Sequence, residues 1–295
     1  MEPIKTHLNV GKYKFQIIDN TLSRDQDIYS RNFKIGGISS ECVNVSIGYR
    51  DNIPISASIP YVVYDPECSI ETPLDRGEGS VIMIKTLLNH IHRQLPTLTE
   101  VKFEDKSNIE CATDIEIEKK GSRFRKKGTN VYPIPLYYFS IAFNGETWYE
   151  KHFRARHRIP ETHVKYRDTV NQLLHDKEFK SSISFIEFLR ISQPPMEIAD
   201  ELEAYYMSSN TFGDFFQSIP REHRCRLVRD WISTFMAHYL RDVFDNTNWI
   251  IELPIRMSGG KSKSRNNHTR KYYCPKGRIY HSRTFRDFGV SALDI

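Results

Sequence analysis

The 295-residue sequence lacks several signals that would assign it to a compartment. It has only five cysteines and no CxxC pair, so reduced thiols in an intracellular protein are the simplest interpretation. Its apolar runs are too short to span a bilayer, and the start of the chain holds no apolar signal-peptide core. We therefore expect a cytoplasmic protein without a membrane-spanning segment.

Motifs of the common catalytic and metal-binding classes are also missing. Neither the nucleotide-binding pattern GxxxxGK[ST] nor the nucleophile pattern GxSxG occurs. His268, Cys274 and His281 combine metal-ligating residue types, but their spacing fits no compact zinc motif. We expect neither a metal site nor a covalent nucleophile.

Positive charge is concentrated near the end of the chain. Residues 256–286 contain ten basic side chains and no acidic one, whereas residues 1–255 carry 32 basic and 35 acidic side chains. Tyrosine and phenylalanine are interleaved with these cations, so the segment could neutralise phosphates and stack on bases. We expect non-specific binding of nucleic acid or another polyanion, with 119–127 as a second basic patch; the alternative is a solvated tail that docks on the protein itself. The residues predicted to bind nucleic acid are Lys261, Lys263, Arg265, Arg270, Lys271 and Arg278.

The first half of the sequence predicts an α/β fold. Alternating apolar residues in 43–47 and 53–59, joined by a turn composition, predict a β-hairpin with one buried face. A helical apolar stripe follows, and Pro96 ends it before a short strand at 99–105. The stripe consists of Val81, Ile84, Leu88, Ile91 and Leu95.

The second half of the sequence predicts helices. Residues 135–155 are aromatic and mostly helical in pattern, with a break near Gly145, and an all-helical region follows Pro160. The best helical pattern covers 221–244. We expect an α/β domain at 1–155, a helical domain at 161–255 that could bind a protein partner, and a basic, partly flexible tail at 256–295.

A short glycine loop precedes the first predicted helix, with the sequence Arg76-Gly77-Glu78-Gly79-Ser80. A helix N-terminus offers unpaired N–H groups and a positive dipole end, glycines allow close approach, and an arginine adds charge-assisted hydrogen bonds. These features predict phosphate binding, although Glu78 must point outward. The alternative is an ordinary glycine turn before a helix.

The order of these elements resembles the GNAT acyltransferase superfamily. In that family an R-G-x-G-x-G/A loop between the fourth strand and third helix binds the pyrophosphate of coenzyme A, and a later helix carries a tyrosine that acts as general acid. Residues 76–80 are similar to that loop, and ETWYEKHFRA at 146–155 is similar to the later helix. The sequence departs from the family pattern in two ways. Val81 stands where the family's loop has a small residue, and an insertion is present at about 106–134.

The resemblance implies a GNAT-like mixed sheet with flanking helices and acetyl-CoA-dependent N-acyl transfer. Arg76, Gly77, Glu78, Gly79 and Ser80 would contact acetyl-CoA, and Tyr149 would protonate the departing thiolate. The base would be one of the acids near these elements, Glu104, Asp105 or Glu150, and we predict Glu104 and Glu150 as catalytic residues.

Several alternatives to this assignment stay open at the level of sequence. Tyr149 could be a packing aromatic between Trp148 and Phe153. The fold could also have lost its activity. The whole protein could be a non-catalytic nucleic-acid-binding or virion-associated protein acting through its basic tail, since this organisation also resembles proteins of large DNA viruses. It could also be a scaffold that uses its helical half.

Overall fold

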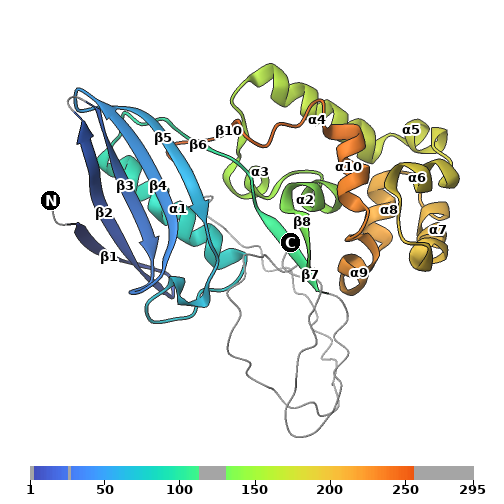
Figure 1. The fold of residues 1–295 in the computed structure, drawn as a ribbon, viewed down its shortest axis with the longest axis horizontal. Coiled ribbons are helices and arrows are strands. Elements are labelled where there is room, and N and C mark those ends of the chain that lie inside the picture. The colour runs from blue at the N-terminus through green and yellow to red at the C-terminus, as the bar shows by residue number, and fades with distance from the viewer. Residues whose placement is uncertain (1–2, 26–27, 113–130, 256–295) are drawn as a thin grey trace, which may run out of the picture.

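A computed structural model describes residues 3–25, 28–112 and 131–255 of the chain (Figure 1). Its architecture is mixed α/β, as the sequence predicts: an eight-stranded sheet lies beside a group of helices. The strand order in this sheet is β1-β2-β3-β4-β5-β6-β10-β9, and β7 pairs with β8 in a separate two-stranded sheet.

The first five strands form an antiparallel meander in which each strand pairs with the next. Asp51 and Asn52 connect the last two strands with φ of 51° and 63°, the backbone that a two-residue hairpin turn requires. The predicted hairpin therefore exists, but its predicted buried face is wrong at Ile53 and Ile55, which are exposed. The five strands are β1 (Ile4–Val10), β2 (Tyr13–Asp25), β3 (Ile28–Gly36), β4 (Glu41–Arg50) and β5 (Ile53–Val62).

Helix α1 (Glu78–Gln94) covers one face of the meander (Figure 1). Its predicted apolar stripe is buried, with Ile84, Leu88 and Ile91 fully covered. Each such side chain contributes roughly 1.5–3 kcal/mol by leaving water. The facing strands contribute every second residue, which is why their pattern alternates: Phe15, Ile17, Phe33, Ile35, Val43, Val45 and Ile47.

Strands from distant parts of the sequence complete the sheet. β6 (Glu100–Phe103) pairs in parallel with β5, and β10 (Trp249–Glu252) lies between β6 and β9 (Arg156–His157). The 161–255 segment, predicted as helical, therefore ends in a strand of the main sheet. Its four residues, WIIE, are too few to show a strand periodicity in the sequence.

Helices fill the chain before β9 and between β9 and β10. The predicted helix at 221–244 is wrong in its extent, because the chain leaves helical geometry at Trp231 (φ −132°). The buried indole of Trp231 donates to the Leu227 carbonyl at this break. The helices are α2 (Leu136–Asn144), α3 (Trp148–Phe153), α4 (Pro160–His175), α5 (Lys177–Ser182), α6 (Phe185–Ser192), α7 (Ala199–Met207), α8 (Phe212–Ser218), α9 (Arg224–Val228) and α10 (Ile232–Leu240).

The core of the helical region is aromatic. Its helices also begin on side chains that satisfy free N–H groups: Thr211 and Asp214 form a capping box, and Asp176 and Ser184 cap the starts of α5 and α6. The fully buried aromatic side chains of these helices are Phe139, Tyr166, Phe188, Phe212, Phe215, Phe216, Trp231 and Phe235.

The expectation of reduced thiols is wrong for four cysteines. Cys42 on β4 is bonded to Cys68, and Cys111 on β7 (Asn108–Ala112) is bonded to Cys225 on α9. The partners are 26 and 114 residues apart, so only the fold brings them together. Among the helices of the described residues, none is both long and apolar enough to cross a membrane.

Candidate functional site

The pairing of strands β5 and β6 stops where β6 ends. Their parallel pairing consists of Ser58 opposite Lys102 and Ile59 opposite Phe103, after which β5 continues to Val62 and β6 ends. A pocket of ≈ 670 Å³ lies at this point. The carboxyl ends of parallel strands are a common place for ligands, because the strands diverge there and leave room between the elements that follow them.

Four further parts of the chain line the same pocket. Ser80 comes from the first turn of α1, and Trp148 and Tyr149 come from α3. Ser107 lies directly before β7, and Pro133 lies in β8 (Val131–Pro135). The pocket therefore joins the start of α1 to the later aromatic helix, the two segments that the sequence resemblance connects.

The glycine loop reaches the pocket at one residue. Of its five predicted contact residues, Ser80 lines the pocket, whereas Arg76, Gly77, Glu78 and Gly79 do not. The guanidinium of Arg76 lies 5.2 Å from the ring centroid of Tyr64, which is itself a lining residue. Arg76 is exposed and lies beside this wall residue, outside the pocket lining itself.

The loop adopts the backbone that its glycines allow. Gly77 has φ 73° and precedes the helix, while a Cβ on Gly79 would come within 2.8 Å of Leu74 Cγ. Glu78 is exposed, and Val81 is buried in the core. Neither side chain lines the pocket. The carboxylate of Glu78 and the branched side chain of Val81 therefore do not block an anion from entering the pocket.

Tyr149 is held in the pocket wall by aromatic contacts. Its ring centroid lies 4.4 Å from that of Phe103 and 5.0 Å from that of Trp148. Burial raises the pKa of the Tyr149 hydroxyl well above its ordinary value, and the charge of Asp105 raises it further. Tyr149 is therefore both a packing aromatic, as one interpretation of the sequence expects, and a residue that lines the pocket, as the other expects.

Glu150 has a structural position. Its Oε2 accepts from Thr147 N at 2.8 Å, which completes the capping box at the start of α3, and from Tyr166 Oη at 2.9 Å. Its Oε1 lies 3.4 Å from Arg167 Nη1. Glu150 does not line the pocket, and its carboxylate joins α3 to α4. Sequence proximity to Tyr149 suggested a catalytic acid, but neighbouring helical residues point in different directions.

Glu104 lines the pocket, as the sequence prediction requires. Its carboxylate is partly exposed and forms an ion pair with Lys106, which also lines the pocket. Lys102 is a third charged lining residue. Glu104 can therefore meet a ligand, but it does so from the solvent-facing rim.

Asp105 is a more unusual acid than either predicted candidate. It is 2 % exposed, and Oδ1 accepts from Ser107 N at 3.1 Å. Oδ2 is buried without a hydrogen-bond partner among the described residues. Burial raises the pKa of this carboxyl to about 6. The sequence places Asp105 at a strand end, but only the fold shows that it is buried while Glu104 is not.

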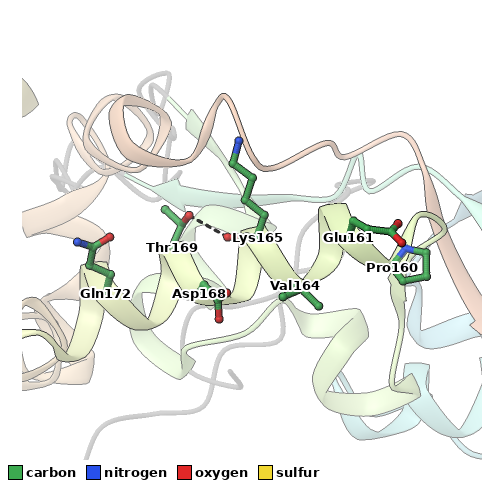
Figure 2. A pocket seen from close by; sticks show the side chains of 7 residues that line it. All are labelled: Pro160, Glu161, Val164, Lys165, Asp168, Thr169 and Gln172. Carbon is green, nitrogen blue, oxygen red and sulfur yellow. Dashed lines mark hydrogen bonds between the residues drawn. The ribbon is translucent and has the colours of Figure 1, made fainter.

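A second hollow, ≈ 500 Å³, lies along α4 (Figure 2). Its described lining residues, from Pro160 to Gln172, all belong to this single helix. The hydrogen bond drawn in Figure 2, from Thr169 Oγ1 to the Lys165 carbonyl, lies within the helix. No other described element supplies an opposing wall, so this hollow is an exposed helix face.

The predicted nucleic-acid contacts lie outside the described residues. These are the basic patch at 119–127 and the six tail residues Lys261, Lys263, Arg265, Arg270, Lys271 and Arg278. In the described ranges, no group of three or more His, Cys, Asp or Glu side chains gathers as metal ligands would.

The chain matches no known family model, no curated protein sequence and no solved structure. The function must therefore be argued from the pocket itself.

Proposed function

We propose that the protein is an acyl-CoA-dependent N-acyltransferase with a GNAT-like sheet. The observation that carries this proposal is the pocket beyond the paired ends of β5 and β6, because it joins the start of α1 to the ring of Tyr149. A pocket in this place would allow a bound thioester to meet an acceptor amine.

The sequence of elements supports the same proposal. The hairpin β4–β5, the glycine loop, α1, the parallel strand β6 and, after β7, β8 and α2, the aromatic helix α3 occur along the chain in the order of the resembled family. The long helical region lies between β9 and β10, so it enlarges the protein without interrupting the pocket.

The residues present fit an acyl-CoA. The first-turn N–H groups of α1, the Ser80 hydroxyl and the exposed Arg76 guanidinium would bind a pyrophosphate. The apolar surfaces of Phe103, Trp148 and Leu136 would exclude water from the thioester. Bound acetyl-CoA supplies the activated acyl group, and Tyr149 Oη–H is the group that can protonate a thiolate at this wall.

Thermal unfolding with millimolar acetyl-CoA tests this proposal. Ligand that binds only the folded state raises its stability, by about 2.7 kcal/mol at one hundred times Kd. We expect the midpoint to rise for the wild type and for Arg93→Ala, an exposed arginine at the far end of the same helix. Arg76→Ala should abolish most of the rise. A wild type that shows no rise contradicts the proposal.

A second activity, binding of polyanions, is supported by charge alone. Residues 256–286 carry ten basic side chains and no acid. A protein lacking 257–286 should lose salt-sensitive binding to DNA and RNA, measured by fluorescence anisotropy at several salt concentrations. Unchanged binding would remove this second proposal and leave the acyltransferase proposal intact.

A further inference from the structure

Lys102 is a charged residue of the pocket lining that has no ion pair with a described residue. It is partly buried in the short strand β6, where it lies opposite Ser58 on β5 and Ile250 on β10. Neither neighbour carries a charge. Partial burial removes some of the water around an ammonium group, so a nearby anion would stabilise it. The described part of the chain does not supply that anion within ion-pair distance.

The acids around Lys102 already have other cations as partners. Two of them lie two residues before and two residues after it along the chain, and the third lies on β10, opposite the first. Because each of these carboxylates is held by another side chain, Lys102 is left available to a ligand in the pocket. The pairs are Glu100 with Arg158, Glu104 with Lys106, and Glu252 with Arg156.

The pocket presents different chemistry on the two faces of the sheet. Successive residues of a strand point to opposite faces. Phe103 contacts the ring of Tyr149 on one face, at 4.4 Å between centroids, so Lys102 reaches the pocket from the other face. Ser58, which is exposed and lies opposite Lys102, adds a hydroxyl on that second face. An aromatic wall thus lies on one side, and a cation with a hydroxyl lies on the other.

A cation in this position discriminates among acceptor amines. It attracts an amine that also carries a carboxylate or a phosphate, because a charge-assisted hydrogen bond to Lys102 would hold that group. It repels a molecule that carries a second ammonium group. Glu104 and Lys106 form a neutral pair, so the preference depends on Lys102.

We propose that Lys102 binds an anionic group of the acceptor, so that the substrate is an amine that also carries a carboxylate or a phosphate. This inference rests on the proposed acyltransferase function. The neutral amine nitrogen forms a bond with the acyl carbon as the carbon–sulfur bond breaks, and the proton that the nitrogen loses ends on the departing thiolate. Lys102 takes no part in these bond changes. It determines which amine is held beside the thioester.

Thiol release from acetyl-CoA, measured with one acceptor at a time, tests this specificity. The acceptors are β-alanine, phosphoethanolamine, ethanolamine and 1,4-diaminobutane. We expect kcat/KM for at least one of the two anionic amines to exceed that for ethanolamine by about 10- to 100-fold, and the diamine to be the slowest. The faster of β-alanine and phosphoethanolamine identifies the anionic group.

Variants of Lys102 assign the preference to its charge. Lys102→Gln should remove most of the preference, mainly by raising KM for the anionic amine, whereas Lys102→Arg should keep it within a few-fold. Lys165→Gln, on the exposed face of α4, is the control and should behave as the wild type. Acetyl-CoA should raise the thermal midpoint of all four proteins equally, which shows that each is folded and binds the thioester.

Several results would overturn the role of Lys102. They are a Lys102→Gln variant that keeps the wild-type preference, and a wild type that binds acetyl-CoA but acylates neither anionic amine or acylates ethanolamine equally well. A loss of acetyl-CoA binding in Lys102→Gln with an unchanged acceptor preference would place Lys102 with the thioester instead. A wild type whose midpoint does not respond to acetyl-CoA contradicts the acyltransferase proposal itself, and this inference then fails with it.

Discussion

The capped helix starts and the pocket differ in how they pair buried polar groups. In the helices, Thr211 and Asp214 satisfy each other's backbone donors, and the buried Tyr206 hydroxyl donates to the Ile183 carbonyl at 2.6 Å. At the pocket, Asp105 keeps one carboxylate oxygen without a donor among the described residues. The first arrangement stabilises the fold, whereas the second lowers stability and leaves a group free for a ligand.

Two acids show the difference within one part of the molecule. Glu150 accepts hydrogen bonds from Thr147, Tyr166 and Arg167, and its removal would leave these donors without that acceptor. Asp105 accepts from Ser107 alone. Burial does not distinguish the two, because Glu150 is 9 % exposed and Asp105 2 %. The number of donors around each carboxylate therefore indicates which acid supports the fold and which is available for chemistry.

The largest effect is expected in the aromatic core of the helices. Trp231→Ala removes a fully buried indole and its hydrogen bond to Leu227, so we expect a loss of about 3–5 kcal/mol of unfolding free energy. Guanidinium unfolding followed by circular dichroism measures this loss. Ile186→Ala, at a 79 % exposed position on α6, is the control and should change stability little. Equal effects of both variants would contradict the described core.

Asp105→Asn should stabilise the protein, which is unusual for a buried polar residue. Burial raises the pKa of Asp105 in the folded state from 3.8 to about 6. The protonated acid therefore makes its full contribution to the stability of the protein below pH 3.8, and that contribution is lost as the pH rises through 6. We expect a gain of about 3 kcal/mol near pH 8 and almost none near pH 4. Urea unfolding at both pH values measures it, with Asp168→Asn as the control. A loss at pH 8 would show that the carboxylate is satisfied.

Glu150→Gln should have the opposite sign. It weakens the acceptor for Thr147 N and Tyr166 Oη and removes the attraction to Arg167. We expect a loss of about 1–3 kcal/mol at neutral pH. Affinity for acetyl-CoA should change little once the protein is folded. If Glu150→Gln keeps its stability but loses the proposed activity, Glu150 belongs to the site after all.

Two tyrosine-to-phenylalanine variants give the sharpest comparison, and one of them, Tyr149→Phe, gives the smallest effect on stability. Tyr166→Phe removes a donor to the Glu150 carboxylate and should cost about 1.5–3 kcal/mol. Tyr149→Phe removes a hydroxyl at the pocket wall and should cost less than about 1 kcal/mol, while abolishing most thiol release. Thermal unfolding of both variants in one buffer makes the comparison. A larger loss in Tyr149→Phe would assign that hydroxyl to the fold.

Much of the fold could be predicted because apolar residues recur along the sequence with the spacing of strands or of helices. The alternation before Gly48 and the helical stripe from Val81 to Leu95 each follow from one buried face. Strand β10 and the break at Trp231 could not be predicted in this way. The first is only four residues long, and the second depends on tertiary packing around one indole.

The pocket brings together two segments that the sequence singles out, but the burial of its acids could not be predicted. The glycine loop and Tyr149 are marked by their residue types, and the fold places Ser80 and Tyr149 in one pocket. Asp105 and Glu104 are adjacent in sequence and identical in charge, so only the pleat of the chain decides that one is buried and the other meets solvent. The pairing of Cys111 with Cys225 likewise depends on the folded chain.

A crystal structure of the protein with acetyl-CoA would test the central claim most directly. The proposal predicts the thioester between β5 and β6 beside Tyr149, with the pyrophosphate at the first turn of α1 near Ser80 and Arg76. Acetyl-CoA bound elsewhere, or a pocket that stays empty at saturating ligand, would contradict it.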